Sequence, residues 1–203
     1  MIPTRNLLVV LLGIAAAWCA DKDKDQFRPG SVSDYPSRQT ISKVTIAVQA
    51  FESEEQARSA FGKNYPNKYG VLPVLVVMQN DSGQVINLEH MKVEYVLPTR
   101  QRAEATPASE VQYLWTPSKP RIIPGPIPTK TQTSSKKNPL AGWEIEGRAF
   151  AAKMLPPSDS ASGFFYFQVV PRAGVIIHIS GLREAATGKE LFFFEIPLES
   201  SPR

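Results

Sequence analysis

Apolar residues recur at strand spacing in two stretches of the first half of the chain. From Val44 to Ala50 every second residue is apolar, the period-two pattern of a strand with one buried face. Residues 71–78, VLPVLVVM, are apolar throughout, which predicts a strand buried on both faces. Pro73 cannot donate to a ladder, so we expect it near the start of that strand or on a sheet edge.

A polar corner follows the second stretch. The residues Asn80–Gly83 bond their own backbone or tolerate positive φ, which predicts a turn. Beyond it Ile86 and Leu88 share one face, whereas the apolar residues of 91–95 have the opposite parity. This step predicts a β-bulge or strand break near His90. Together the corner and its flanks predict a hairpin.

The C-terminal third contains three apolar runs, at 162–170, 174–180 and 190–198. The turn-prone residues Thr187–Lys189 predict that the last two runs pair as a hairpin. Alternation in the last run assigns four side chains to one apolar, core-facing side: Phe192, Phe194, Ile196 and Leu198.

Two short helices are predicted. Ser53 followed by Gln56 is a capping box, and Gly62 supplies a C-terminal stop about two turns later. Asn138 before a proline is typical of a second helix start, and that helix is expected to end at Met154, before two prolines.

Composition limits the fold class. The chain has 203 residues, of which 42% are apolar and 21% charged, enough for one sizeable core. Its 18 prolines exclude long helices, because an interior proline removes a donor and clashes with the preceding turn. With the strand pattern, this predicts a mainly β fold: an immunoglobulin-like antiparallel β-sandwich of about 7 strands with two short helices.

Residues 1–20 resemble a secretory signal peptide. Arg5 precedes an uncharged apolar run of eleven residues, 7–17, and a run of charges begins at Asp21. Such a run is too short to cross a hydrocarbon core of about 30 Å, but it suits the apolar region of a signal peptide. We therefore expect export to the periplasm or outer envelope.

Cys19 is the only cysteine of the chain and stands at the end of the apolar run. Its position resembles that of the acylated cysteine of bacterial lipoproteins, although Trp18 occupies a place that normally holds a small residue. Two outcomes stay open: lipidation at Cys19, or ordinary cleavage near Ala17 or Ala20. Membrane contact is expected only through such an anchor.

The rest of the chain is assigned to one domain with a tether. Residues 21–40 mix charges with Pro, Gly and Ser and are interpreted as flexible, and 41–203 as a single sandwich domain. Residues 97–112 are polar and loop-like, and 116–138 form a proline-rich basic loop expected to be extended or disordered.

The formal net charge is +4, or about +3 if Arg5 leaves with the signal. Five basic residues lie in the proline-rich loop with no acid among them: Lys119, Arg121, Lys130, Lys136 and Lys137. Contact with an anionic surface is one interpretation, and a solvated linker is the one we favour. Nucleic acid is not expected as a partner, because no aromatic residues interleave with these side chains.

No local motif for catalysis, metal binding or cofactor binding occurs. His178 lies between two isoleucines without a cysteine, histidine or paired acid at ligand spacing, so a partly exposed strand histidine is the favoured interpretation, and His90 is similar. Glu144 and Glu146 would diverge on a helix. No catalytic, cofactor or metal residue is assigned, and no cofactor is expected.

Two passages resemble uncharacterised bacterial envelope proteins, secreted or lipid-anchored, that have an immunoglobulin-like sandwich. They are GVLPVLVVMQNDSGQVINL and MLPPSDSASGFFYFQVV, with TGKELFFFEIPL as the closing strand. The resemblance implies fold and compartment and assigns no functional residue.

The sequence thus predicts an exported, non-catalytic binding or accessory module of the cell envelope, whose partner is an envelope protein or polymer. One alternative is a periplasmic assembly chaperone, which would show an open strand edge beside a hydrophobic groove. Another is an enzyme with a spatially assembled site, which would show a pocket where titratable groups converge.

Overall fold

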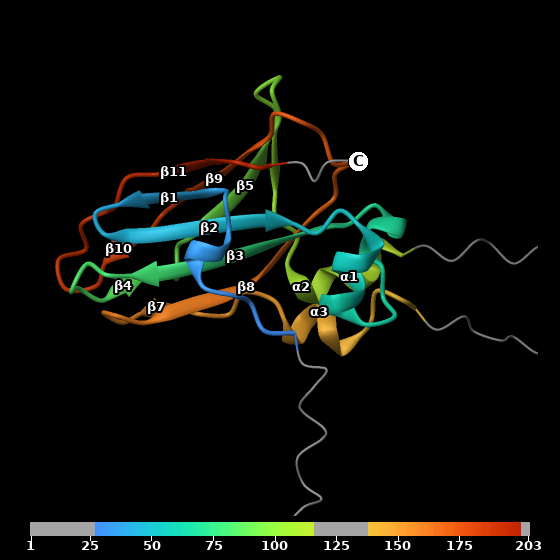
Figure 1. Ribbon diagram of the computed structural model, residues 1–203, viewed down its shortest axis with the longest axis horizontal. Helices are drawn as coiled ribbons and strands as arrows, with labels where there is room; N and C mark the ends of the chain where they lie inside the picture. Colours follow the sequence, from blue (N-terminus) through green and yellow to red (C-terminus); the bar gives the residue numbers. More distant parts are fainter. Residues whose placement is uncertain (1–26, 116–137, 200–203) are drawn as a thin grey trace, which may run out of the picture.

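The computed structural model describes residues 27–115 and 138–199 and is mainly β, with three antiparallel sheets and a few short helices (Figure 1). The strands are β1 (Arg38–Ile41), β2 (Val44–Ala50), β3 (Leu72–Asn80), β4 (Ile86–Asn87), β5 (Lys92–Val96), β6 (Arg102–Glu104), β7 (Met154–Leu155), β8 (Ser160–Phe167), β9 (Ile176–Ser180), β10 (Arg183–Glu184) and β11 (Phe194–Pro197). The helices are α1 (Glu54–Phe61), α2 (Ala108–Val111) and α3 (Trp143–Gly147), with short 3-10 turns η1 (Val32–Asp34), η2 (Pro66–Tyr69) and η3 (Gln112–Leu114).

The strands form a first sheet in the order β1-β2-β3-β8, a second sheet in the order β10-β4-β7, and a third sheet in the order β11-β9-β5-β6. The second sheet lies at one end of the molecule, and the three helices gather at the other (Figure 1). Because the pairings join strands far apart in sequence, such as β3 with β8, the fold depends on long-range contacts.

The first sheet is the middle of three layers. One face packs on the third sheet, and side chains of both sheets form one core, such as Val76 and Met78 with Tyr95, Ile177 and Ile179. The opposite face packs on the helices through a second core. Its members include Leu75 and Val77 from β3, Tyr166 from β8, Phe61 from α1 and Ile145 from α3.

This layering confirms the prediction for residues 71–78. Every residue of β3 is buried except Gln79, because its two faces meet two different cores. Pro73 is the second residue of the strand, which confirms the expectation that it lies near the start. The strand predicted at 44–50 is also confirmed as β2.

The predicted hairpin after β3 is wrong. β3 pairs with β2 and β8, whereas β4 pairs with β10 and β7 in the second sheet. The reason is Asn80, whose buried side-chain amide donates to the carbonyl oxygens of Gln84 (2.7 Å), Leu155 (2.9 Å) and Pro156 (3.0 Å). These bonds tie the corner to the segment before β8 and direct the chain into another sheet.

The predicted break near His90 is confirmed, because a turn separates β4 from β5 there. The pairing of the last two apolar runs is also confirmed, since β11 is antiparallel to β9. Phe192, however, was assigned to the core face and is 74% exposed. Strand β11 begins only at Phe194, so the alternation does not extend back to Phe192.

The first predicted helix is confirmed as α1, with the Ser53 hydroxyl oxygen accepting a hydrogen bond from the Gln56 N–H at 3.1 Å. The second was predicted to run to Met154 and is wrong in extent, because α3 covers only Trp143–Gly147. Beyond it the backbone turns to pair with β8, where the Phe164 N–H donates to Arg148 O at 2.9 Å. That strand pairing competes with helical continuation.

Two other segments differ from their predictions. Residues 21–40 were interpreted as a tether, yet β1 lies within them in part and pairs with β2 along its whole length. Residues 97–112 were interpreted as loop, yet they contain β6 and α2. The proline-rich loop 116–138 lies outside the described residues apart from Asn138.

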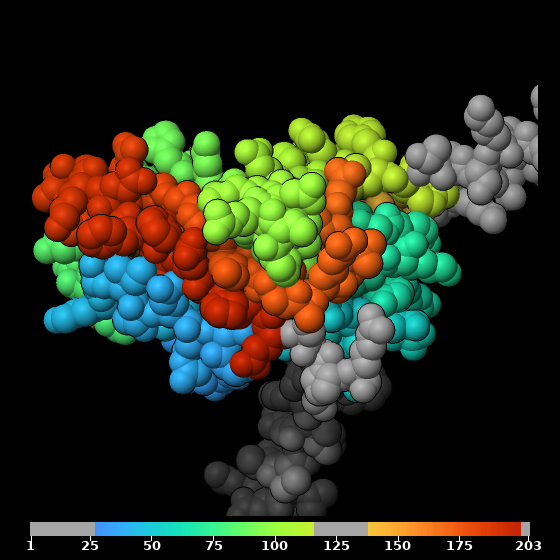
Figure 2. Space-filling view, turned by 90° about the horizontal axis from the view of Figure 1, so that it is seen from above, coloured from blue at the N-terminus to red at the C-terminus, as the bar shows by residue number. Residues whose placement is uncertain are grey.

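The first and third sheets meet differently along their two long sides. On one side β1 adjoins β11, and the Glu195 N–H donates to Gln39 Oε1 at 2.8 Å. In the view from above, blue β1 lies directly beside the red C-terminal strands, and the green β5–β6 segment lies on the other side of them (Figure 2). On the opposite side β8 faces β5 and β6, and the side chains of these strands leave an opening between the two sheets.

Candidate functional site

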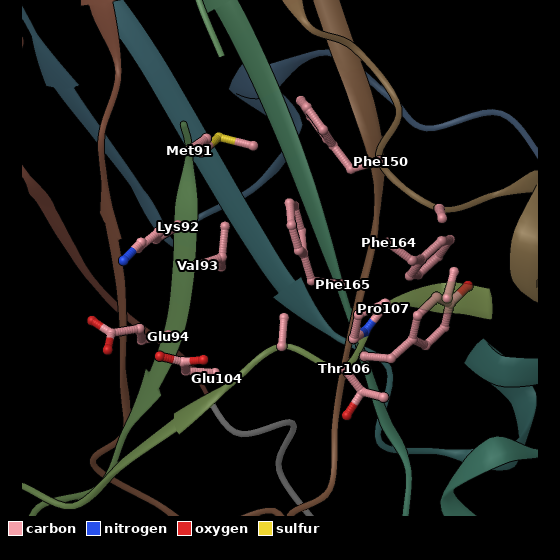
Figure 3. Close-up of a pocket in the computed structure, with 14 residues that line it drawn as sticks. Met91, Lys92, Val93, Glu94, Glu104, Thr106, Pro107, Phe150, Phe164 and Phe165 are labelled. Atoms are coloured by element: carbon pink, nitrogen blue, oxygen red, sulfur yellow. The ribbon is translucent and has the colours of Figure 1, made fainter. Parts of the chain in front are cut away.

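A groove of about 310 Å³ opens on the side where β5 and β6 face β8 (Figure 3). It is lined by residues 91–94, 104–108, 149–150 and 164–166. Its walls therefore come from both large sheets, and one end is closed by the chain that leaves β6. This volume lies at the lower limit for ligand pockets, about 300–1,000 Å³.

The register of the third sheet explains the groove. β6 pairs with β5 only over Glu94–Val96, so within residues 27–115 and 138–199 Lys92 and Val93 have a strand neighbour in β9 and none on the other side. After Glu104 the chain crosses to the first sheet, where the Thr106 N–H donates to Tyr166 O at 2.7 Å. The crossing leaves the beginning of β5 beside an unfilled gap.

The middle of the groove is apolar. Phe150 and Phe165 stack with ring centroids 5.4 Å apart, and both side chains are half-buried. Val93 and Phe165 lie between the two facing strands, with Phe150 above them near Met91 (Figure 3). Met91, Phe150 and Phe165 are half-buried and leave apolar surface partly open to water, which a ligand can cover.

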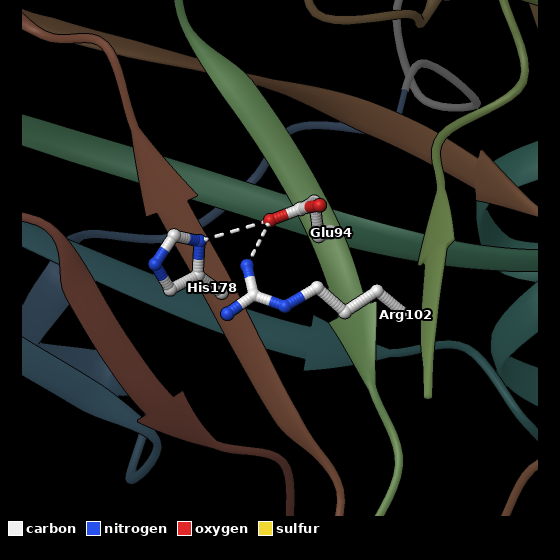
Figure 4. A network of polar contacts seen from close by, with 3 residues as sticks. All are labelled: Glu94, Arg102 and His178. Atoms are coloured by element: carbon white, nitrogen blue, oxygen red, sulfur yellow. Dashed lines mark hydrogen bonds and ion pairs between the residues drawn. The ribbon is translucent and has the colours of Figure 1, made fainter. Parts of the chain in front are cut away.

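The rim of the groove is charged and carries two opposed glutamates. Glu94 and Glu104 are register partners on neighbouring strands, a placement that is unfavourable for like charges. Glu94 is neutralised, because its Oε2 lies 2.7 Å from Arg102 Nη1 and 3.2 Å from His178 Nδ1 (Figure 4). Among the described residues Glu104 and Lys92 form neither an ion pair nor a side-chain hydrogen bond.

Glu104 and Glu94 belong to a polar row across the outer face of the third sheet. The register places Glu195, His178, Glu94 and Glu104 side by side, one from each strand. Successive members are separated by the usual strand spacing of about 4.8 Å. The ends of the row are thus too far apart to act on one atom.

His178 is more enclosed than its sequence context indicated. Its side chain is only 13% exposed, and its ring stacks on that of Phe193 at 5.4 Å. Nδ1 is shielded from water and has no hydrogen-bond partner among the described residues. Its contact with Glu94 Oε2 at 3.2 Å is electrostatic and is an ion pair only when the imidazole is protonated. The acid comes from another strand, so no local motif signals it.

Beside the helices Arg148 lies between two aromatic rings. The Arg148 guanidinium carbon is 5.6 Å from the centroid of the Phe27 ring and 5.9 Å from that of Trp143. Its Nη1 is buried without a hydrogen-bond partner in the described part of the chain, and desolvation lowers the pKa of Arg148. These contacts hold the start of the described chain against α3.

The remaining residues considered from the sequence do not join the groove. His90 is exposed in the turn between β4 and β5, and Glu144 and Glu146 lie on α3. Cys19 and the basic residues of the proline-rich loop lie outside the described residues. The groove itself was missed, because it is assembled from four separate segments.

Within residues 27–115 and 138–199 no three His, Cys, Asp or Glu side chains gather as a metal-ligand set. None of the helices in these ranges has the length and apolar character needed to cross a bilayer. Compared with known protein families and with curated proteins, the sequence matches none.

Proposed function

We propose that this chain is an exported, non-catalytic binding module of the bacterial cell envelope. The first and third sheets would serve as an immunoglobulin-like scaffold, and the groove between β5, β6 and β8 as the binding element. Export is supported by the sequence pattern of residues 1–20 and by the charge run after it.

The observation that carries the proposal is the combination found at the groove. Apolar side chains line its middle. Among the described residues, two charged side chains on its rim have no partner and one strand edge beside it has no neighbour. Binding sites typically combine an apolar lining with a few placed polar groups. The arrangement favours recognition of a ligand by shape and charge.

Binding is favoured over catalysis by where the titratable groups stand. Lys92, Glu94 and Glu104 lie along the outer rim, whereas Val93 and Phe165 line the space between the strands (Figure 3). A general acid or base has to reach a reacting atom held in the pocket. Side chains that face away from the apolar middle suit orientation of a ligand better.

The second candidate is a periplasmic assembly chaperone that works by strand addition. The beginning of β5 and the outer side of β6 are strand edges next to an apolar groove, the feature expected for that activity. The two candidates differ in what the partner is: a folded envelope component for the module, or an unassembled subunit for the chaperone.

Export is tested by the intact mass of the mature protein from its own host. A mass that starts at Cys19 with acyl groups indicates a lipid-anchored module, and an unmodified chain that starts near Ala20 indicates a freely secreted one. A mass that retains Met1 contradicts export.

Binding is tested by saturable association of the mature chain with envelope fractions isolated from a host strain that lacks it. The variant Phe165→Ala removes apolar lining from the groove, and we expect it to weaken association about tenfold, as loss of an interface anchor does. Phe192→Ala, which removes an equally large but 74% exposed ring away from the groove, is the matched control. Equal association of Phe165→Ala and the unaltered chain refutes the groove as the binding element.

A further inference from the structure

We infer that the groove receives a short extended polypeptide segment that carries a basic side chain, which lies beside Glu104. The inference rests on the proposed function, because it names the chemistry of the partner that the groove would bind. Three features of the described residues lead to it: an unpaired strand edge, a small apolar volume and an unneutralised carboxylate.

The strand edge indicates that the partner is a polypeptide. Lys92 and Val93 pair with Ser180 and Ile179 on one side, and no strand of the described residues lies opposite them on the side of the groove. An extended segment supplies backbone donors and acceptors at the spacing that such an edge offers. Lipids and sugars do not repeat amides at that spacing.

The volume limits what enters the groove. About 310 Å³ is enough for one or two side chains rather than for a larger folded element. The lining by Phe150, Phe165 and Met91 favours an apolar side chain in the middle. In an extended segment side chains alternate between the two faces, so the neighbours of that apolar residue would face the charged rim.

The carboxylate of Glu104 selects the sign of the neighbour that lies beside it, whereas the ammonium group of Lys92 on the same rim favours no basic side chain at its own position. Glu94 contacts the basic side chains of Arg102 and His178. Glu104, directly opposite on β6, has no ion-pair partner in the described part of the chain. A lysine or arginine of the partner beside Glu104 would supply the countercharge that this carboxylate lacks among the described residues. Arg102 is already engaged with Glu94 at 2.7 Å.

The probe for the test is a synthetic blocked peptide of five residues that alternates valine and lysine and begins with valine. It is titrated into the isotopically labelled mature chain, and binding is followed by backbone amide shifts in nuclear magnetic resonance spectra. An otherwise identical peptide with glutamate in place of lysine is the charge control. A third peptide, methylated at alternate amide nitrogens, is the control for backbone pairing.

We expect the lysine peptide to shift the amides of Lys92, Val93 and Ala105, with a Kd of about 1 mM or tighter. The variant Glu104→Lys is expected to weaken it about fivefold, since attraction at an exposed site becomes repulsion. Glu195→Lys makes the same charge change on the same face of the same sheet, three strands away, and serves as the matched control. We expect it to change the Kd less than about twofold.

The inference is overturned if the glutamate peptide binds as well as the lysine peptide, if the methylated peptide binds unchanged, or if the shifts lie away from the groove. It is also overturned if Glu104→Lys and Glu195→Lys have equal effects. Glu104 and Glu195 are both exposed, so we expect both variants to fold. Circular dichroism spectra of the two variants test this expectation.

The envelope association experiment separates this inference from the proposed function. If Phe165→Ala weakens envelope association while the lysine peptide does not bind, the groove remains the binding element and the polypeptide inference is wrong. If Phe165→Ala leaves envelope association unchanged, the proposed function fails whatever the peptide does.

Discussion

Asn80 is the residue whose replacement tests most sharply how the chain is directed from the first sheet to the second. Its side chain is fully buried, and its amide nitrogen donates to Gln84 O, Leu155 O and Pro156 O at 2.7–3.0 Å. Its Oδ1 accepts hydrogen bonds from the Ser82 N–H at 3.0 Å and the Ser82 hydroxyl at 2.6 Å. One side chain therefore joins three segments.

The cost of Asn80→Ala follows from these bonds. A net hydrogen bond contributes about 1 kcal/mol, and the amide offers two protons and one acceptor oxygen, so the loss is about 3 kcal/mol. Asn80→Asp is nearly isosteric and keeps the acceptor oxygen, but at neutral pH it places a carboxylate against three carbonyl oxygens. We expect it to cost on the order of 4 kcal/mol.

Urea unfolding measures both effects. With a slope of about 2 kcal/mol/M, Asn80→Ala should lower the midpoint by about 1.5 M. Burial raises the pKa of the new carboxyl group in the folded state, so the native state binds its proton more tightly than the unfolded state. The deficit of Asn80→Asp should therefore shrink as the pH falls toward about 4, whereas that of Asn80→Ala should not change.

Refutation is direct. If the unfolding free energy of Asn80→Asp lies within about 1 kcal/mol of that of the unaltered chain at neutral pH, the hydrogen bonds donated by the Asn80 amide do not stabilise the corner. A deficit of Asn80→Asp that is independent of pH contradicts the account as well, because a buried carboxylate has to titrate.

Three other predictions concern the cores and the rim. Burial raises the pKa of Tyr166 well above the ordinary value of 10.0, so the unfolded state loses the phenol proton at lower pH than the folded state. Above about pH 10 this tyrosine should lower the unfolding free energy by about 1.4 kcal/mol per pH unit. Urea unfolding at several pH values should show a smaller decrease for Tyr166→Phe. A Cβ on Gly163 would overlap the backbone of Phe150, so Gly163→Ala should lower the unfolding free energy by at least about 3 kcal/mol, and an unchanged melting temperature would exclude the close approach. Arg102 is 51% exposed, so solvent and salt should screen its ion pair with Glu94. A double-mutant cycle of Glu94→Gln and Arg102→Gln should give a coupling energy below about 1 kcal/mol that decreases with added salt. A larger coupling energy that does not depend on salt would contradict this expectation.

Long periodic segments could be predicted from the sequence because burial dictates their residue types. β3 reads as a continuous apolar run because both of its faces are covered, and β2 alternates visibly enough to be located. The capping box at Ser53 located α1 for an equally local reason. Each of these signals is contained within about ten residues.

The partners of each strand could not be predicted in the same way. β4, β7 and β10 have only two residues each, too few to show a period. The position of β7 beside β4 is supported by the bond from the Asn80 amide to Leu155 O, a contact between residues 75 positions apart. Helix α3 stops early because its following residues pair with β8, a tertiary contact that intrinsic propensity does not report.

The groove was hidden from sequence reasoning for the same reason. Glu94 and His178 are far apart in sequence and adjacent only through the pairing of β5 with β9. Glu104 lies in a segment interpreted as loop, and its significance depends on the register that places it opposite Glu94. Charge pairs across strands leave no local spacing to recognise.

The most direct test of the binding account is site-specific photocrosslinking in living host cells, with a photoreactive amino acid introduced at Ala105 in the groove. The same amino acid at Glu195, exposed on the outer face of the third sheet away from the groove, is the control. The account predicts a discrete adduct with an envelope component from Ala105 that is absent from Glu195 and weakened when Phe165→Ala is added. Identical adducts from both positions, or none from Ala105 while the chain is folded and exported, would contradict it.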